Sequence, residues 1–214
     1  MFWFNQLLSD LTHDTAFSKK CAAALVEEKR FTDIKILSSA LDEEENENAC
    51  LIASRILYEV SQINPSLLEK RIDSFIEICV GEKEILYNNS LRILIALAPA
   101  RHKKIFRKLD VISDVILKGD DDVRDSFLAL MVVLAKISPD YYKEICDALR
   151  MILEISPSEV FIACAEKILP VIDKNNFECF QEILIRRKND LNISDQKEVD
   201  RMLSYILLRI TGEN

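Results

Sequence analysis

Glycine is scarce in this chain, at three residues in 214. So few glycines exclude glycine-rich phosphate-binding loops and leave a turn-rich β protein short of turn residues. Histidine is also rare, and His13 and His102 lie far apart without the spacing of a metal-binding motif. The longest clear apolar run, residues 127–135, is much shorter than the roughly 18 residues that a membrane span requires. The sequence therefore predicts no cofactor, no metal site and no membrane span.

The six cysteines include no C-x-x-C pair. An even number of cysteines would allow disulfide bonds, but several of these residues fall on apolar helix faces, where a reduced thiol serves as a small core side chain. The N-terminus carries neither a basic region nor a small-residue cleavage site, so it does not resemble a secretory signal. These features predict reduced cysteines and a cytoplasmic protein.

Positive charge is in deficit. Lysine and arginine number 28 against 36 acidic residues, which gives a formal net charge of −8. Such a balance opposes general affinity for nucleic acid or for anionic membranes. Hydrophobic residues make up 49% and charged residues 30% of the chain, which is ordinary for a soluble protein. We interpret residues 1–214 as a single domain.

What the sequence has in quantity is helical periodicity. The clearest case is Asp120–Pro139, which begins with three acids, where a helix N-terminus favours carboxylates. Ser138-Pro139 ends it, because proline cannot continue a helix but suits the first turn of the next one. Between them, apolar residues recur at steps of three and four, as on one face of an α-helix: Val123, Phe127, Leu130, Leu134 and Ile137.

Similar units recur along the chain in pairs of helices. The first helices are predicted to begin near Thr32, Pro65, Arg101, Pro139 and Asn175, and the second near Glu47, Tyr87, Asp121, Pro157 and Ser194. Successive starts in each series are separated by about 33 to 40 residues, the period of a solenoid built from helix pairs.

The second helices resemble those of HEAT repeats, which open with acids followed by Val-Arg. Asp122-Val123-Arg124 matches that pattern, and Leu91-Arg92 matches part of it. The chain departs from the family at Ser126 and Phe127, where HEAT repeats carry alanine. The resemblance implies a HEAT-like or armadillo-like protein over residues 32–211, with second helices on the concave side of a protein-binding scaffold.

We therefore predict an all-α fold, a right-handed α-α superhelix of about five helix pairs preceded by N-terminal capping helices in residues 1–31. The aromatic and apolar residues of segment 2–12 predict either a cap over the helix that follows or an interface with a partner or a second copy.

No catalytic constellation is apparent. The acids Asp120, Asp121 and Asp122 are better explained as helix capping than as paired acid–base groups, so we predict that the protein is not an enzyme, and an unrecognised enzyme is the last alternative. The predicted function is that of a scaffold or adaptor that binds another protein, with a homodimer as a related form.

The predicted binding surface is the outer stripe of the second helices, opposite their core-facing residues. The alternative is that the middle helices are buried on more than one side. The candidate protein-binding residues are Tyr58, Arg92, Ile93, Ala96, Asp125, Val132 and Lys136.

A basic cluster is predicted to occupy the first two turns of a helix over residues 101–118, where cations oppose the helix dipole. It is either an anion-binding site for nucleic acid or another polyanion, or a solvated face. Its residues are Arg101, Lys103, Lys104, Arg107 and Lys108. The acidic run Asp42–Glu47 has two similar interpretations, a solvated turn or a binding site for a basic partner.

Overall fold

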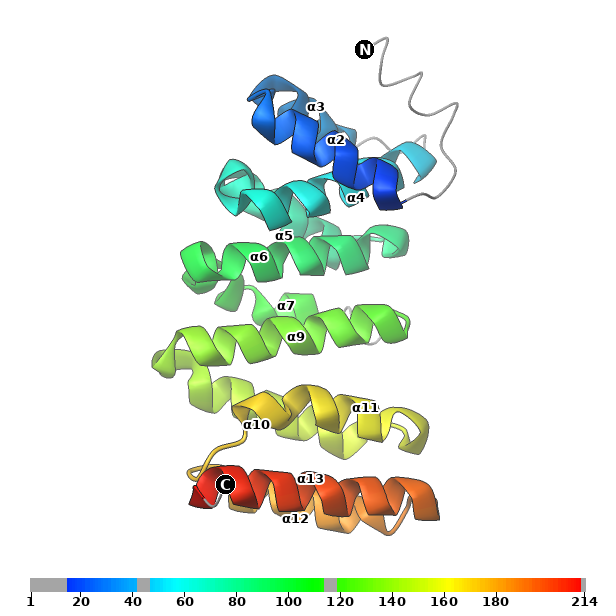
Figure 1. The fold of residues 1–214 in the computed structure, drawn as a ribbon, viewed down its shortest axis with the longest axis vertical. Helices are drawn as coiled ribbons and strands as arrows, with labels where there is room; N and C mark the ends of the chain where they lie inside the picture. Colours follow the sequence, from blue (N-terminus) through cyan, green and yellow to red (C-terminus); the bar gives the residue numbers. More distant parts are fainter. Residues whose placement is uncertain (1–14, 42–46, 114–118, 213–214) are drawn as a thin grey trace. The chain divides into compact units, whose positions relative to one another are not determined.

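The structure, a computed structural model, describes residues 15–41, 47–113 and 119–212. Every regular element in these ranges is a helix (Figure 1), which confirms the predicted all-α class. The chain divides into two compact units, Met1–Ser126 and Phe127–Asn214. The division falls inside helix α9 (Asp121–Ile137).

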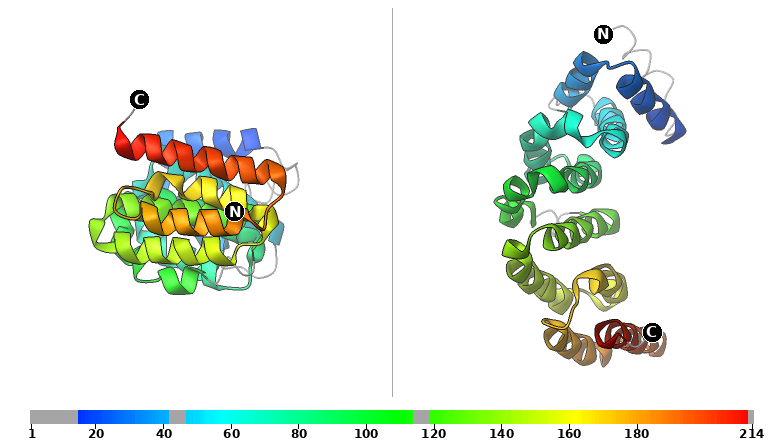
Figure 2. Two further views of the ribbon diagram at one scale, coloured as in Figure 1. Left: turned by 90° about the horizontal axis from the view of Figure 1, so that it is seen from below. Right: turned by 60° about the vertical axis from the view of Figure 1, so that its left-hand side comes forward.

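The first unit is built of stacked helical hairpins. Helix α4 packs against both α2 and α3, and α6 packs against both α4 and α5, while α7 follows on α5. Figure 2 shows these helices in successive layers. The elements are α2 (Thr15–Glu27), α3 (Phe31–Ala40), α4 (Glu47–Ile63), the 3-10 helix η1 (Pro65–Arg71), α5 (Ile72–Val80), the 3-10 helix η2 (Glu84–Leu86), α6 (Tyr87–Phe106) and α7 (Leu109–Ser113).

The second unit repeats this arrangement. Helix α10 pairs with α11 and α12 pairs with α13, while α10 lies against α12 and α11 against α13. First helices thus stack on first helices and second on second. After the last part of α9, its elements are α10 (Pro139–Ile155), α11 (Ser158–Ile168), the 3-10 helix η3 (Leu169–Val171), α12 (Phe177–Lys188) and α13 (Ile193–Thr211).

Polar side chains join successive hairpins at a nearly constant sequence separation. In the first unit Asn89 donates to the Ser54 hydroxyl across 35 residues. In the second unit Asn176 donates to the Tyr142 hydroxyl across 34 residues. The separation equals the period of predicted helix starts, because residues one repeat apart occupy equivalent places in neighbouring hairpins. The period in the sequence is therefore reflected in contacts inside each unit.

Two helix starts have side-chain caps, and one helix ends at a glycine in the left-handed conformation. The Asp120 carboxylate accepts a hydrogen bond from the Val123 backbone N–H at 3.0 Å, as an N-cap does. The Asn192 side chain caps α13 in the same way, accepting from the Asp195 N–H at 3.0 Å. Helix α13 ends at Gly212, whose φ of 72° is left-handed. Capping thus accounts for Asp120, the first of the three acids at the start of α9, while Asp121 pairs with Arg124.

The helix predicted over residues 101–118 begins near the predicted place but ends early. Helix α6 consists of two helical parts that meet at a kink at Arg101 (φ −132°, ψ 18°), with Pro99 inside the first part, and the second part ends at Phe106. Buried residues on both sides of the kink, Leu97 and Ile105, hold the two parts in the core. A proline can kink a helix without ending it when packing holds both parts.

The sequence Ser156-Pro157-Ser158-Glu159 matches the pattern of a capping box, which predicts Ser156 as the N-cap of α11. The Ser156 hydroxyl instead donates to the Ile152 carbonyl at 2.6 Å, one turn back in α10. Helix α11 has Pro157 as its N-cap residue and no side-chain cap. Ser156 therefore belongs to the end of α10. Its hydroxyl donates to a carbonyl of the last turn of that helix and is not available to cap α11.

Each unit has its own apolar core, in which Phe75 and Leu57 are fully buried in the first unit and Phe161 and Phe180 in the second. All six cysteines are free, and four of them are buried: Cys50, Cys79, Cys146 and Cys164. None of the helices in the described ranges has the length and apolarity needed to cross a bilayer.

Candidate functional site

Tyr58 of α4 and Arg92 of α6 lie together on one surface of the first unit. The Arg92 guanidinium carbon sits 4.0 Å from the centroid of the Tyr58 ring. One guanidinium N–H also donates to the Tyr58 hydroxyl at 2.5 Å. Tyr58 is half-buried and Arg92 is exposed. The stacking orders both side chains, so the pair presents a rigid amphipathic surface to solvent.

A polar row extends from this pair along the N-terminal parts of the same helices. Asn89 donates to the Ser54 hydroxyl at 2.9 Å. The Ser126 hydroxyl donates to the Asn88 side-chain oxygen at 2.6 Å. These bonds fix the register of α4, α6 and the start of α9 in the first unit, and thereby position Tyr58 against Arg92.

Two further predicted residues lie on this unit with partial exposure. Ala96 follows Arg92 by one turn of α6 and is half-buried, and so is Asp125 in the second turn of α9. We call Tyr58, Arg92 and Ala96 the α4–α6 face. Lys136, near the end of α9, is exposed but belongs to the second unit.

Ile93 and Val132 were expected on the outer stripe, and this expectation is wrong. Ile93 is 0% exposed and Val132 is 8% exposed. At about 100° per residue, the buried residues of α6 span a wide arc from Ile93 to Leu91, and those of α9 reach Val132. Both residues lie at the edge of their arcs. The alternative interpretation, burial on more than one side, describes these two positions.

Of the five cations in the basic cluster, two form ion pairs with carboxylates of the preceding hairpin. Arg101 pairs with Glu69 of η1 at 2.8 Å, and Lys104 pairs with Asp73 of α5 at 2.6 Å. Lys103, Arg107 and Lys108 are exposed, and within the described ranges no ion pair joins them to a carboxylate. Arg101 is the non-helical residue at the kink, Lys103 and Lys104 lie in the short helical part after it, and Arg107 and Lys108 follow the end of α6 at Phe106. The five cations therefore do not share the first two turns of one long helix, as was predicted.

A second basic group, at the end of α12, is structural. Arg187 donates to the carbonyls of Leu153, Glu154 and Ser156 at 2.9, 2.6 and 2.6 Å. Its guanidinium carbon also lies 4.9 Å from the centroid of the Phe161 ring. The last carbonyls of any helix lack intrahelical partners. The Arg187 side chain supplies partners for those of α10 and therefore caps the C-terminus of that helix.

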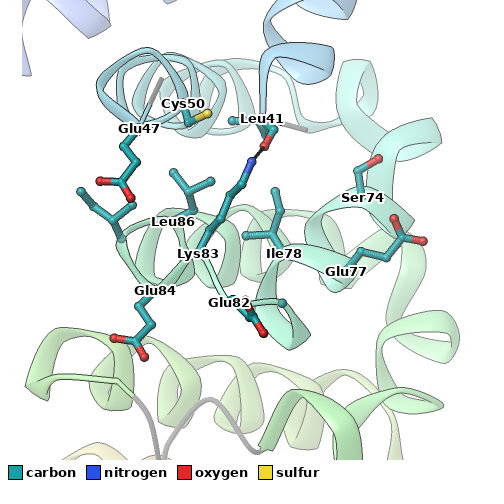
Figure 3. A pocket seen from close by; sticks show the side chains of 12 residues that line it. Leu41, Glu47, Cys50, Ser74, Glu77, Ile78, Glu82, Lys83, Glu84 and Leu86 are labelled. Atoms are coloured by element: carbon teal, nitrogen blue, oxygen red, sulfur yellow. Dashed lines mark hydrogen bonds between the residues drawn. The ribbon is translucent and has the colours of Figure 1, made fainter. Parts of the chain in front are cut away.

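The first unit also has a pocket of about 890 Å³ where the end of α3 and the start of α4 face α5 and the loop before α6. Its apolar wall consists of buried Leu41, Ile78 and Leu86, with Ile85 exposed at the edge. Lys83 crosses the middle of the pocket (Figure 3) and donates to the Leu41 carbonyl at 2.8 Å.

The remaining charged residues at the pocket are acidic. Glu47 and Glu84 lie on one side, Glu77 lies on the other, and Glu82 lies beside Lys83 (Figure 3). All four glutamates are exposed. Sequence reasoning missed this pocket. The signal was available in the period, because Glu47 and Glu84 are separated by about one repeat.

The described residues offer few side chains suited to metal binding or catalysis. Within the described residues no three His, Cys, Asp or Glu side chains are grouped as metal ligands. Burial raises the pKa of the Cys79 thiol to about 12, so this thiol is protonated at neutral pH and is not a nucleophile. His102 is half-buried on α6, and His13 lies outside the described residues.

No family model matches the chain, and no curated protein matches it. A solved structure that is similar to it is the crystal structure of an engineered protein from the Northeast Structural Genomics Consortium. The two chains share 19% identity with a TM-score of 0.55, and the match covers 96% of this chain and 97% of the other. At that identity the similarity concerns the fold alone.

Proposed function

We propose that the chain is a HEAT-like or armadillo-like repeat protein, a right-handed superhelix in which residues 32–211 form about five helix pairs. The support is the period itself. The helix starts recur at one repeat length, and the bonds between hairpins, such as Asn89–Ser54 and Asn176–Tyr142, span the same length. In this arrangement α2, which lies in the described part of residues 1–31, caps the first hairpin, and the chain is one continuous domain.

We propose further that the protein is a non-catalytic scaffold that binds another protein through the α4–α6 face. The observation that carries this proposal is the Tyr58–Arg92 pair, drawn from two helices 34 residues apart and held in one exposed stack. Tyrosine and arginine dominate the energetically important residues of protein interfaces, because each offers both apolar area and hydrogen bonding. A pair that is ordered before binding loses little entropy when a partner arrives.

A protein partner suits the chemistry of this surface better than a polyanion does. Beside the single cation Arg92 the α4–α6 face offers a tyrosine ring, and Ala96 leaves room for a partner side chain to approach the helix. We place the protein in the cytoplasm, because six free thiols, four of them buried, fit a reducing compartment.

The test is capture of partners from a lysate of the source cells on the tagged chain and on a double variant, Tyr58→Ser with Arg92→Glu. We expect the variant to lose specific partners by at least about tenfold in recovered amount, because interface anchors of this kind each contribute about 2 kcal/mol or more. Its helical circular dichroism should stay unchanged, because Arg92 is exposed and Tyr58 is only half-buried.

The matched control is Tyr205→Ser with Arg201→Glu on α13, which makes the same two chemical changes at exposed positions of the second unit. It should retain every partner. Equal loss in both double variants, or no loss in either, would remove the α4–α6 face as the binding surface. Light scattering of the purified chain tests the homodimer form, because a dimer through this face would dissociate in the first double variant.

Binding of nucleic acid or another polyanion through residues 101–108 remains the alternative function. Only Lys103, Arg107 and Lys108 are left to provide it, since Glu69 and Asp73 neutralise the other two cations. A gel-shift assay at low salt should show no retardation of single- or double-stranded nucleic acid. Retardation that weakens steeply with salt, and that is lost in a triple Lys103→Gln, Arg107→Gln, Lys108→Gln variant, would support the alternative instead.

A further inference from the structure

The pocket between α3–α4 and α5–α6 is a second, separate surface of the first unit. It shares no residue with the α4–α6 face. Its volume of about 890 Å³ is in the range of clefts that hold several side chains or a small ligand. Lys83 and the buried leucines give it a fixed wall, because the Lys83 ammonium is held by the Leu41 carbonyl at 2.8 Å.

The charge around this pocket restricts what can occupy it. Glu47, Glu77, Glu82 and Glu84 line the pocket together with one lysine, Lys83, and no ion pair joins any of the four glutamates to a cation within the described residues. An anionic ligand would be repelled by them. A purely apolar ligand would remove water from carboxylates without offering them a partner, at an energetic cost. Only a cationic occupant gains from the acidic rim.

The apolar wall restricts the occupant further. Ile85 is 48% exposed at the edge of the pocket, and Leu41, Ile78 and Leu86 line its interior. Lysine and arginine side chains combine a charged end with an aliphatic stem that packs on apolar surface. A free cation would contact the glutamates and leave the apolar wall uncovered. A peptide with basic and aliphatic residues contacts both the glutamates and the apolar wall.

We propose that this pocket binds a short, extended peptide segment that contains both basic and aliphatic side chains. The basic side chains meet Glu77, Glu82 and Glu84, and an aliphatic side chain covers Ile85. The segment belongs to a protein partner, which gives the chain a second point of attachment besides the α4–α6 face.

The test uses the purified chain and a fluorescein-labelled peptide of alternating lysine and leucine, measured by fluorescence anisotropy. A triple variant, Glu77→Gln, Glu82→Gln and Glu84→Gln, is expected to weaken binding by roughly tenfold, the combined effect of three exposed ion pairs. A glutamate–leucine peptide is expected not to bind. The Ile85→Ser variant should weaken the lysine–leucine peptide and leave a lysine–serine peptide unchanged.

The matched control is Glu144→Gln, Glu166→Gln and Glu182→Gln, which removes the same charge from three exposed positions of the second unit. It should bind the lysine–leucine peptide like the original chain. Equal weakening in the two triple variants would mean that net charge alone attracts the peptide, and would overturn the proposal, as would an Ile85→Ser variant with no selective effect. The Tyr58→Ser, Arg92→Glu variant should still bind the peptide, so this result stands apart from the outcome for the α4–α6 face.

Discussion

Replacing Ile93 with glutamate is expected to unfold the first unit or to leave it close to unfolding. The Ile93 side chain is 0% exposed, at the edge of the buried arc of α6. A carboxylate in this position must either stay charged without a partner or be protonated at a cost, and the isoleucine packing is lost as well. We expect a loss of about 4 kcal/mol or more, near the upper limit for single substitutions. Urea unfolding followed by circular dichroism measures it.

The neighbouring position provides the control. Arg92 is one residue along the same helix and is exposed, so Arg92→Glu should cost less than about 1 kcal/mol, the scale of an exposed cation–ring contact. Ile93→Val should cost about 1 kcal/mol, as expected for the removal of one buried methylene. An Ile93→Glu variant as stable as Arg92→Glu would show that Ile93 is at the surface, as the sequence pattern alone had indicated.

Arg187→Ala is expected to be the most damaging substitution of a charged residue in the second unit. The side chain is only 13% exposed, and its three hydrogen bonds to carbonyls close the end of α10. Hydrogen bonds from a charged donor contribute about 1.5–3 kcal/mol each, but water can replace part of them at a helix end. We therefore expect a loss of about 2–4 kcal/mol, measured from urea unfolding curves.

Arg186 supplies the comparison, because it is adjacent and its ion pair with Glu154, at 2.6 Å, is about half exposed on both sides. Arg186→Ala should cost less than about 1 kcal/mol, as exposed ion pairs do. Arg187→Lys should recover only part of the loss, since one ammonium cannot bind three carbonyls in the geometry of the guanidinium. Similar losses for Arg186→Ala and Arg187→Ala would contradict the capping role.

The helices of this chain could be predicted because their signals are local. Proline and aspartate mark the starts of α9 and α10 within one residue, and the apolar residues of α9 are spaced at three and four. Tyr58 and Arg92, both on the predicted binding surface, are 34 residues apart and meet in the structure, as residues in equivalent places of neighbouring hairpins do. Helix starts and apolar spacing predicted from local signals are therefore found in the structure, because neighbouring hairpins repeat the same packing.

The features that sequence reasoning missed depend on packing. The exposure of Ile93 depends on how far neighbouring helices wrap around α6, which an apolar pattern on one helix does not give. Helix α6 runs on through Pro99 before it breaks at Arg101, because core contacts of Leu97 and Ile105 hold both parts. Arg187 has the composition of a solvated helix end, and only the hairpin before it supplies the carbonyls that it caps. The N-terminal cap or interface predicted in residues 2–12 lies outside the described residues.

The central claim, that the α4–α6 face binds a protein partner, is tested most directly by site-specific photocrosslinking. A photoreactive benzoylphenylalanine is placed at Ala96, beside Arg92, and in a second variant at Lys143, an exposed residue of α10. In source-cell lysate, the account predicts a discrete crosslinked species from position 96 that disappears when Tyr58→Ser and Arg92→Glu are added, and no such species from position 143. Absence of an adduct at position 96, or the same adducts from both positions, would contradict it.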